Sequence, residues 1–163
     1  MTAREAEIIE LIRKEVKPAL GCTEPIAVAL AVAKAMEIIE EKYALEATWR
    51  MGKDYGLRVE VSGNILKNVK SVVVPHTGGM RGIPAAVAAG IVAGKPQLEL
   101  EVISGTSEEE IREIAHYLNS TPITVHFADT PHIFDIMITL SYKDESSFVR
   151  ITSLSRASSV GAV

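Results

Sequence analysis

The sequence predicts an α+β fold, in which N-terminal helices pack on a mixed or antiparallel sheet within a single domain. Three observations lead to this fold class. The first third of the chain carries apolar residues at helical spacing, and the last third carries short β-branched segments. The length of 163 residues suits one domain of ordinary size. Hydrophobic residues make up 47% but aromatic residues only 5%, so the core must be aliphatic.

Four segments have helical periodicity, and we expect helices over 3–16, 25–43, 84–93 and 108–118. The helix over 25–43 is apolar on most of its faces until its Glu-rich end, which indicates burial. The helix over 84–93 consists mainly of Ala and Val, so it can pack closely against a neighbour. Thr106 and Ser107 are expected to cap the last helix, with Glu109 at the capping-box offset from Thr106.

Strands are predicted over 44–51, 57–61, 71–74, 98–103, 123–127, 134–142 and 148–153. The segment 98–103 is assigned by its alternating pattern, and a helix is the alternative for it. The last two of these strands would form a hairpin, and residues 65–69 are expected to form a helical turn. The C-terminal residues 155–163 are small and polar, which is typical of a tail that frays. We therefore expect one domain over 1–154 and a frayed tail over 155–163.

Composition excludes several classes of function. The net charge of −4 provides no basic surface for nucleic acid. The longest apolar run, residues 26–33, is too short to cross a bilayer. The charged N-terminus does not resemble a signal peptide. One cysteine rules out an internal disulfide and fits a reducing cytoplasm, where we expect the protein to be located.

The single cysteine, Cys22, lies where two prolines and a glycine interrupt the apolar N-terminal region. Thr23 is expected to cap the following helix, and Pro25 suits its first turn. Cys22 would then lie just before a helix N-terminus, where free N–H groups and the helix dipole favour a thiolate. The alternative is a small buried hydrophobic residue with no chemical role.

Two further segments combine polar side chains with glycine. The loop 75–82 precedes a helix, so its N–H groups can face an anion, and Arg81 can clamp a carboxylate. A plain strand-to-helix connection is the simpler interpretation of this loop. Ser62, Asn64 and Asn68 surround a turn, where such residues are common for structural reasons alone. The four histidines show no ligand spacing, so we expect no self-contained metal site.

Two sequence blocks resemble one enzyme family. The first is PALGCTEP over residues 18–25, followed by the apolar helix. It is similar to the N-terminal signature of the L-cysteine desulfidases, which are relatives of the iron–sulfur L-serine dehydratase alpha chain. The second block comprises SGNILKN over 62–68 and VPHTGG over 74–79. The resemblance covers residues 14 to about 103, and beyond them only the order of elements agrees.

The resemblance implies a pyridoxal-independent β-elimination that converts L-cysteine or L-serine to pyruvate and ammonia. A [4Fe–4S] cluster would polarise the substrate, with Cys22 as one of several cluster ligands or as the base. The matched residues would bind the carboxylate and amino group of the amino-acid substrate. These residues are Ser62, Asn64, Asn68, Thr77, Gly78 and Gly79.

Members of that family are more than twice as long as this chain, and a cubane cluster needs at least three thiolates. No cluster is therefore expected on this chain alone. The chain would be an N-terminal portion of a longer lyase, one of two subunits, or a degenerate relative. We expect it to be inactive without a C-terminal half or partner subunit. The sequence does not decide whether the chain forms homo-oligomers. The second hypothesis is a non-catalytic domain that binds a small anionic metabolite or docks a partner chain.

Overall fold

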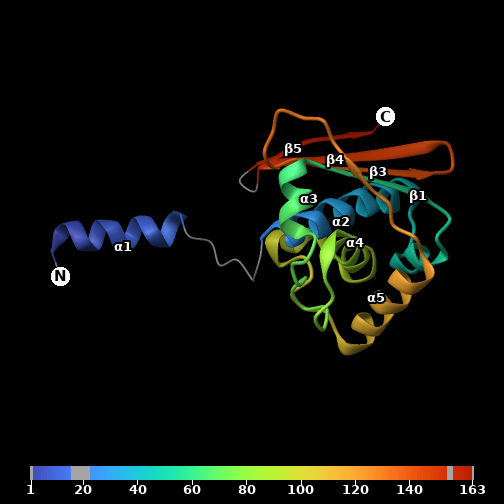
Figure 1. Ribbon diagram of the computed structural model, residues 1–163, viewed down its shortest axis with the longest axis horizontal. Helices are drawn as coiled ribbons and strands as arrows, with labels where there is room; N and C mark the ends of the chain where they lie inside the picture. Colours follow the sequence, from blue (N-terminus) through green and yellow to red (C-terminus); the bar gives the residue numbers. More distant parts are fainter. Residues whose placement is uncertain (1, 16–22, 154–155, 163) are drawn as a thin grey trace.

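The computed structural model describes residues 2–15, 23–153 and 156–162 (Figure 1). The α-helices are α1 (Ala3–Glu15), α2 (Thr23–Tyr43), α3 (Gly63–Val69), α4 (Gly82–Ala93) and α5 (Glu108–Ser120). Two 3-10 helices are η1 (Ala47–Gly52) and η2 (Pro96–Glu101). The strands are β1 (Gly56–Val61), β2 (Val125–Phe127), β3 (Ile136–Tyr142), β4 (Glu145–Ser153) and β5 (Arg156–Ala162). The expected α+β class is confirmed.

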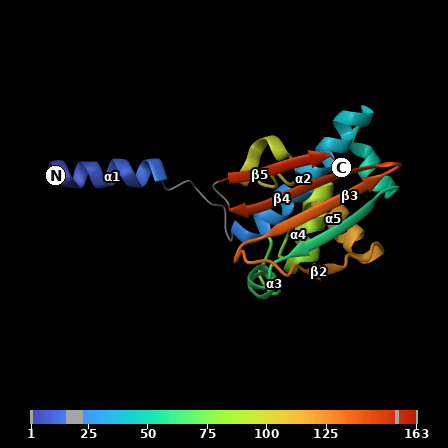
Figure 2. The ribbon, with the colours of Figure 1, turned by 90° about the horizontal axis from the view of Figure 1, so that it is seen from above.

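The strands form one mixed sheet in the order β2-β1-β3-β4-β5 (Figure 2). β1 and β2 are parallel, and the other pairs are antiparallel. Val61 at the end of β1 pairs with Ile136 at the start of β3, and Ile136 pairs with Ile151 of β4. α3 follows β1 directly. We call this end of the sheet, where β1 stops and α3 begins, the α3 end.

One face of the sheet packs on α2, with α4 and α5 farther from the sheet (Figure 1). Alternate strand residues such as Val59, Ile138 and Val149 are buried toward α2, as the two-residue period of a strand requires. The Ser147 hydroxyl donates to the carbonyl of Ala35 over 3.0 Å and so ties α2 to β4. The aliphatic core predicted from composition therefore lies between the sheet and α4.

α2 and α4 pack backbone against backbone. An added Cβ at Gly90 would lie 2.6 Å from the Ala29 carbonyl oxygen, and one at Gly94 would lie 2.7 Å from the Ala33 Cβ. From the first contact to the second, the position moves four residues forward along α4 and four residues forward along α2. The two helices therefore cross with the same sense, at a wide angle (Figure 1), and their N-terminal ends lie on the same side of the crossing.

Two predicted strands are helical instead. Residues 44–51 were expected to be extended, but η1 forms there because Arg50 folds inward: its guanidinium is paired with Glu40 and donates to the carbonyl of Ile91. Trp49 also donates to Glu40, over 2.8 Å. Residues 98–103 overlap η2 rather than a strand. Residues 71–74 contribute only a bridge between Val73 and Arg81.

The cap of α5 and the C-terminal segment also differ from expectation. Ser107, not Thr106, caps α5, and its capping-box partner is Glu110 rather than Glu109. Residues 156–162, expected to fray, pair with β4 as strand β5. Among the residues that the structure describes, no helix combines the length and apolar character needed to cross a membrane.

The close approach of α2 and α4 gives a testable prediction. Gly90→Ala should lower the free energy of unfolding by about 1–3 kcal/mol, because its methyl group would collide with backbone atoms of α2. Gly105→Ala is the matched control, since nothing lies within 4 Å of its added Cβ. Urea denaturation followed by circular dichroism measures both variants. Equal stability of the two variants would contradict the packing described for α2 and α4.

Candidate functional site

Ser62, predicted as a binding residue, joins β1 to the segment before β3 at the α3 end. Its hydroxyl donates to the carbonyl of Ile133 over 2.7 Å and accepts from the Asp135 N–H at 3.3 Å. Its own N–H donates to the Asp135 carbonyl over 2.9 Å. The residue is 2% exposed. Ser62 therefore positions the backbone of this end, and its hydroxyl already has a donor and an acceptor as partners.

The Asp135 carboxylate beneath this junction is fully buried and paired with Arg150. The guanidinium donates to both carboxylate oxygens, over 2.9 and 2.6 Å, and the Thr130 hydroxyl donates over 2.7 Å. Burial alone would raise the pKa of Asp135, but the hydrogen bonds from Arg150 and Thr130 outweigh burial and hold the pKa below its usual value. A charged pair thus anchors β3 to β4.

α3 carries the two predicted asparagines, Asn64 and Asn68, which are both exposed. The helix contacts both α2 and α4. Its C-terminal end meets the start of α4, because an added Cβ at Gly82 would lie 3.2 Å from the Lys70 carbonyl oxygen. Gly82 also has a φ of 89°, a left-handed conformation that favours glycine. The asparagines therefore lie on the helix that leads into the loop 75–82, which we call the glycine loop.

The glycine loop turns sharply just before α4. Thr77 is fully buried, and its hydroxyl donates to the Val74 carbonyl over 2.7 Å. Positive φ angles occur at His76, Gly78 and Gly79. A side chain at Gly78 would meet Ile111 of α5, whereas nothing lies within 4 Å of an added Cβ at Gly79. Thr77 therefore holds the turn together, and the backbone at Gly79 is open.

The N-terminal ends of α2 and α4 complete this region. α4 follows the glycine loop directly, and no side chain caps it at Arg81. The Arg81 guanidinium donates to the Ser71 carbonyl over 2.8 Å. α2 begins at Thr23 on the same side of the helix crossing. Cys22, predicted as catalytic and metal-binding, lies outside the described residues.

The structure thus gathers the predicted residues in two groups, which are linked by the contact between α3 and α4. Ser62, Asn64 and Asn68 belong to α3 and its start, while Thr77, Gly78 and Gly79 form the loop into α4. The sequence reasoning missed Asp135 and Arg150, because an acidic and a basic residue 15 positions apart give no local signal. Within the described ranges, no cluster of three or more His, Cys, Asp or Glu side chains could hold a metal ion.

Exposed apolar side chains surround the same end of the sheet. Phe127 is 63% exposed and Ile133 75% exposed. An added Cβ at Gly63 would lie 3.1 Å from the Phe127 ring, so this ring lies over the start of α3. Leu66 of α3 is 37% exposed. We call Phe127, Ile133 and Leu66 the apolar rim.

These features define an α+β domain with polar groups and the uncapped start of α4 at one end of its sheet. The chain is similar to proteins named UPF0597. One from Desulfitobacterium hafniense is 44% identical over 143 residues, which cover 88% of this chain and 31% of that protein. One from Lachnoclostridium phytofermentans is 37% identical over 161 residues, covering 96% and 36%. One from Finegoldia magna is 43% identical over 131 residues, covering 79% and 28%.

The chain spans about a third of the length of these curated relatives. No protein-family model matches it, and no solved structure matches it. The expected membership in the L-cysteine desulfidase and iron–sulfur L-serine dehydratase family is wrong, because the relatives aligned over most of this chain carry the UPF0597 name. The iron–sulfur lyase activity inferred from that membership is corrected with it, since the name UPF0597 states no such activity.

The buried pair gives a second prediction. Because the pKa of Asp135 is lower in the folded than in the unfolded chain, its contribution to stability is present above about pH 4 and is lost as the pH falls further. Asp135→Asn should cost about 2 kcal/mol at pH 7 and remove this part of the acid dependence, since it leaves the half-buried Arg150 without a charged partner.

The matched control is Glu60→Gln, which breaks the surface pair of Glu60 with Arg58 at 3.4 Å. This change should alter stability by less than about 0.5 kcal/mol. Urea denaturation at a series of pH values between pH 3 and pH 7 measures both variants. These limits lie roughly one pH unit below and three pH units above the usual carboxyl pKa. Similar losses for the two variants would show that the Asp135–Arg150 pair has no special weight.

Proposed function

We propose that this chain is a domain that binds a small anionic metabolite at the α3 end. The proposal depends on one observation: the N-terminal ends of α2 and α4 lie on the same side of their crossing. The first N–H groups of a helix lack intrahelical partners, and the helix dipole places a partial positive charge there. Two such ends on one side of a domain favour an anion between them.

The segments around α4 can supply further contacts to an anion. The backbone at Gly79 has open space beside it. Arg81 is exposed and uses one guanidinium nitrogen on the Ser71 carbonyl, which leaves other N–H donors for a carboxylate or phosphate. Asn64 and Asn68 add exposed amide groups on α3. Small carboxylates, amino acids among them, and phosphates suit this donor-rich surface.

The chemistry of the proposed site is binding, and no reaction is assigned to it. The open side of the site also leaves room for further polypeptide to enclose a bound ligand. We include a cytoplasmic location in the proposal, because a reducing compartment keeps the single cysteine as a thiol.

A second candidate function is docking of further polypeptide on the apolar rim. Phe127 and Ile133 expose most of their side chains to solvent, at 63% and 75%. Apolar residues that gather on a surface mark interaction sites more often than those that stand alone. Because the chain spans about a third of the length of its UPF0597 relatives, the occupant we propose is the remainder of such a longer protein.

Titration of the ¹⁵N-labelled domain with inorganic phosphate and with L-serine tests the anion site. We expect amide shifts at Gly78, Gly79 and Ile83, because these groups lie at the start of α4. Arg81→Met should weaken binding about tenfold, which corresponds to loss of one charged hydrogen-bonding partner. Arg112→Met is the matched control on the exposed face of α5 and should leave binding unchanged. Shifts confined to other parts of the domain, or equal effects of the two variants, would overturn the proposed site.

The docking candidate has a separate test. If the apolar rim also drives self-association of the isolated domain, replacing both Phe127 and Ile133 by Ser should lower the associated fraction in sedimentation velocity. Leu98→Ser provides a control, because Leu98 is a similarly exposed apolar residue (42%) that belongs to η2 and not to the rim. The same decrease with the control would show that general surface hydrophobicity, and not the rim, causes association.

A further inference from the structure

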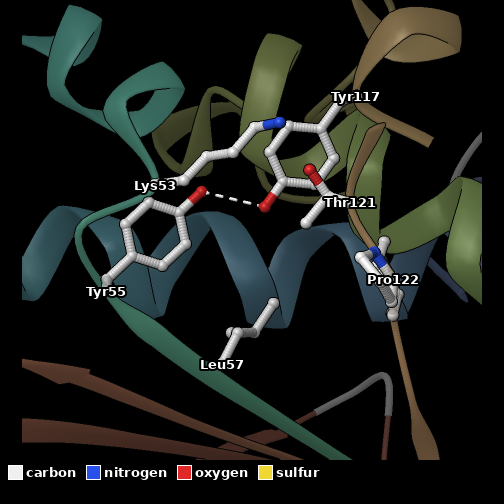
Figure 3. A pocket seen from close by; sticks show the side chains of 7 residues that line it. Lys53, Tyr55, Leu57, Tyr117, Thr121 and Pro122 are labelled. Carbon is white, nitrogen blue, oxygen red and sulfur yellow. Dashed lines mark hydrogen bonds between the residues drawn. The ribbon is translucent and has the colours of Figure 1, made fainter. Parts of the chain in front are cut away.

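A cavity of about 140 Å³ lies at the start of β1, at the opposite end of this strand from Ser62. It is lined by Lys53, Tyr55, Leu57, Tyr117, Thr121, Pro122 and Ile123 (Figure 3). A cavity of about 150 Å³ is sufficient for a molecule the size of benzene. The volume therefore suits a ligand with a few carbon atoms.

The cavity contains one cation, and its position is fixed. The Lys53 ammonium donates to the Ser120 hydroxyl over 2.8 Å and lies 5.1 Å from the centre of the Tyr117 ring. The Ser120 hydroxyl in turn donates to the His116 carbonyl. An ammonium has three N–H donors, and this contact uses one of them. Lys53 thus retains donors for a negatively charged group.

The two tyrosines form a neutral hydrogen-bonded pair beside the ammonium. The Tyr55 hydroxyl donates to the Arg50 carbonyl over 2.8 Å, so the Tyr117 hydroxyl, 3.1 Å away, is the donor to Tyr55. Burial raises the pKa of both tyrosines, so both hydroxyls stay protonated at neutral pH. No phenolate therefore competes for the charge of Lys53.

Thr121 provides a polar group that the folded chain does not use. Its hydroxyl oxygen is buried and has no hydrogen-bond partner among the residues that the structure describes. A buried hydroxyl without a partner is unfavourable, so such groups call for an explanation. Thr121 also lines the cavity, so a rotation of its side chain would bring this hydroxyl to a ligand inside the cavity.

The remaining walls are apolar and come from Leu57, Pro122 and Ile123. We propose that this cavity is a second binding site, which takes a small aliphatic monocarboxylate. Its carboxylate binds the Lys53 ammonium and the Thr121 hydroxyl, and its short carbon chain packs against the apolar wall. This site is separate from the one proposed at the α3 end and does not depend on it.

Butyrate is the probe that tests this site, and butyramide is its neutral counterpart of similar shape. We expect butyrate to bind with a dissociation constant on the order of millimolar and butyramide at least about tenfold more weakly, since only butyrate pairs with the ammonium. The amide shifts of Thr121 and Ile123 report binding directly. Trp49 provides a second signal by fluorescence, because this single tryptophan packs 5.1 Å from the Tyr55 ring.

Two variants assign the contacts. Lys53→Met should weaken butyrate at least about tenfold, and Thr121→Val, which keeps the side-chain shape, about threefold to tenfold. Lys95→Met is the matched control at an exposed lysine that does not line the cavity and should bind as the original protein does. Equal binding of butyrate and butyramide to the original protein, or equal affinity of Lys53→Met and Lys95→Met, would overturn the proposal. The comparison of the two ligands needs no substitution, so it decides the question even if a variant fails to fold.

Discussion

The contact of α2 with α4 through Gly90 and Gly94 is the constraint on which the rest of the structure depends. Both glycines lie so close to α2 that even a methyl group would overlap its atoms. This proximity sets two buried helices against each other, within a core of Ala, Val and Ile that has few aromatic residues. It also places the starts of the two helices on the same side of their crossing. The site proposed at the α3 end is therefore a consequence of helix packing as well as of the polar residues around it.

Much of this fold could be predicted from the sequence, because helical and strand periods are local properties. The helix over 25–43 and the hairpin of β3 and β4 are clear from pattern alone. Residues 44–51 were misjudged because their conformation depends on a contact that is distant in the sequence. Arg50 is only 7% exposed, pairs with Glu40 and donates to the carbonyl of Ile91, and the local residue pattern carries no information on these contacts. Strand β5 was missed for a related reason, since its small residues gain order from β4 rather than from their own propensity.

At the candidate site, too, local features could be predicted from the sequence and long-range contacts could not. Ser62 and Thr77 were predicted as binding residues, and in the structure both hydroxyls donate to backbone carbonyls and hold turns in place. Residue type alone does not distinguish a hydroxyl that positions backbone from one that binds a ligand. The pairing of Asp135 with Arg150 could not be foreseen, because it depends on the register of β3 against β4. The family assignment failed because it was based on two short blocks, whereas alignment over most of the chain leads to the UPF0597 proteins.

The two proposed binding sites differ in what surrounds them, and this difference bears on how each would work. Exposed apolar side chains, Phe127 and Ile133 above all, border the α3 end. Further polypeptide packed on them would exclude water, and a charge interaction gains strength as the surrounding dielectric constant falls. An anion at the α3 end would then be held more tightly in a longer protein than in this domain alone. The cavity at Lys53 already has its cation, its hydroxyls and its apolar wall within one domain. Its affinity should therefore be a property of this domain, independent of what covers the opposite end of β1.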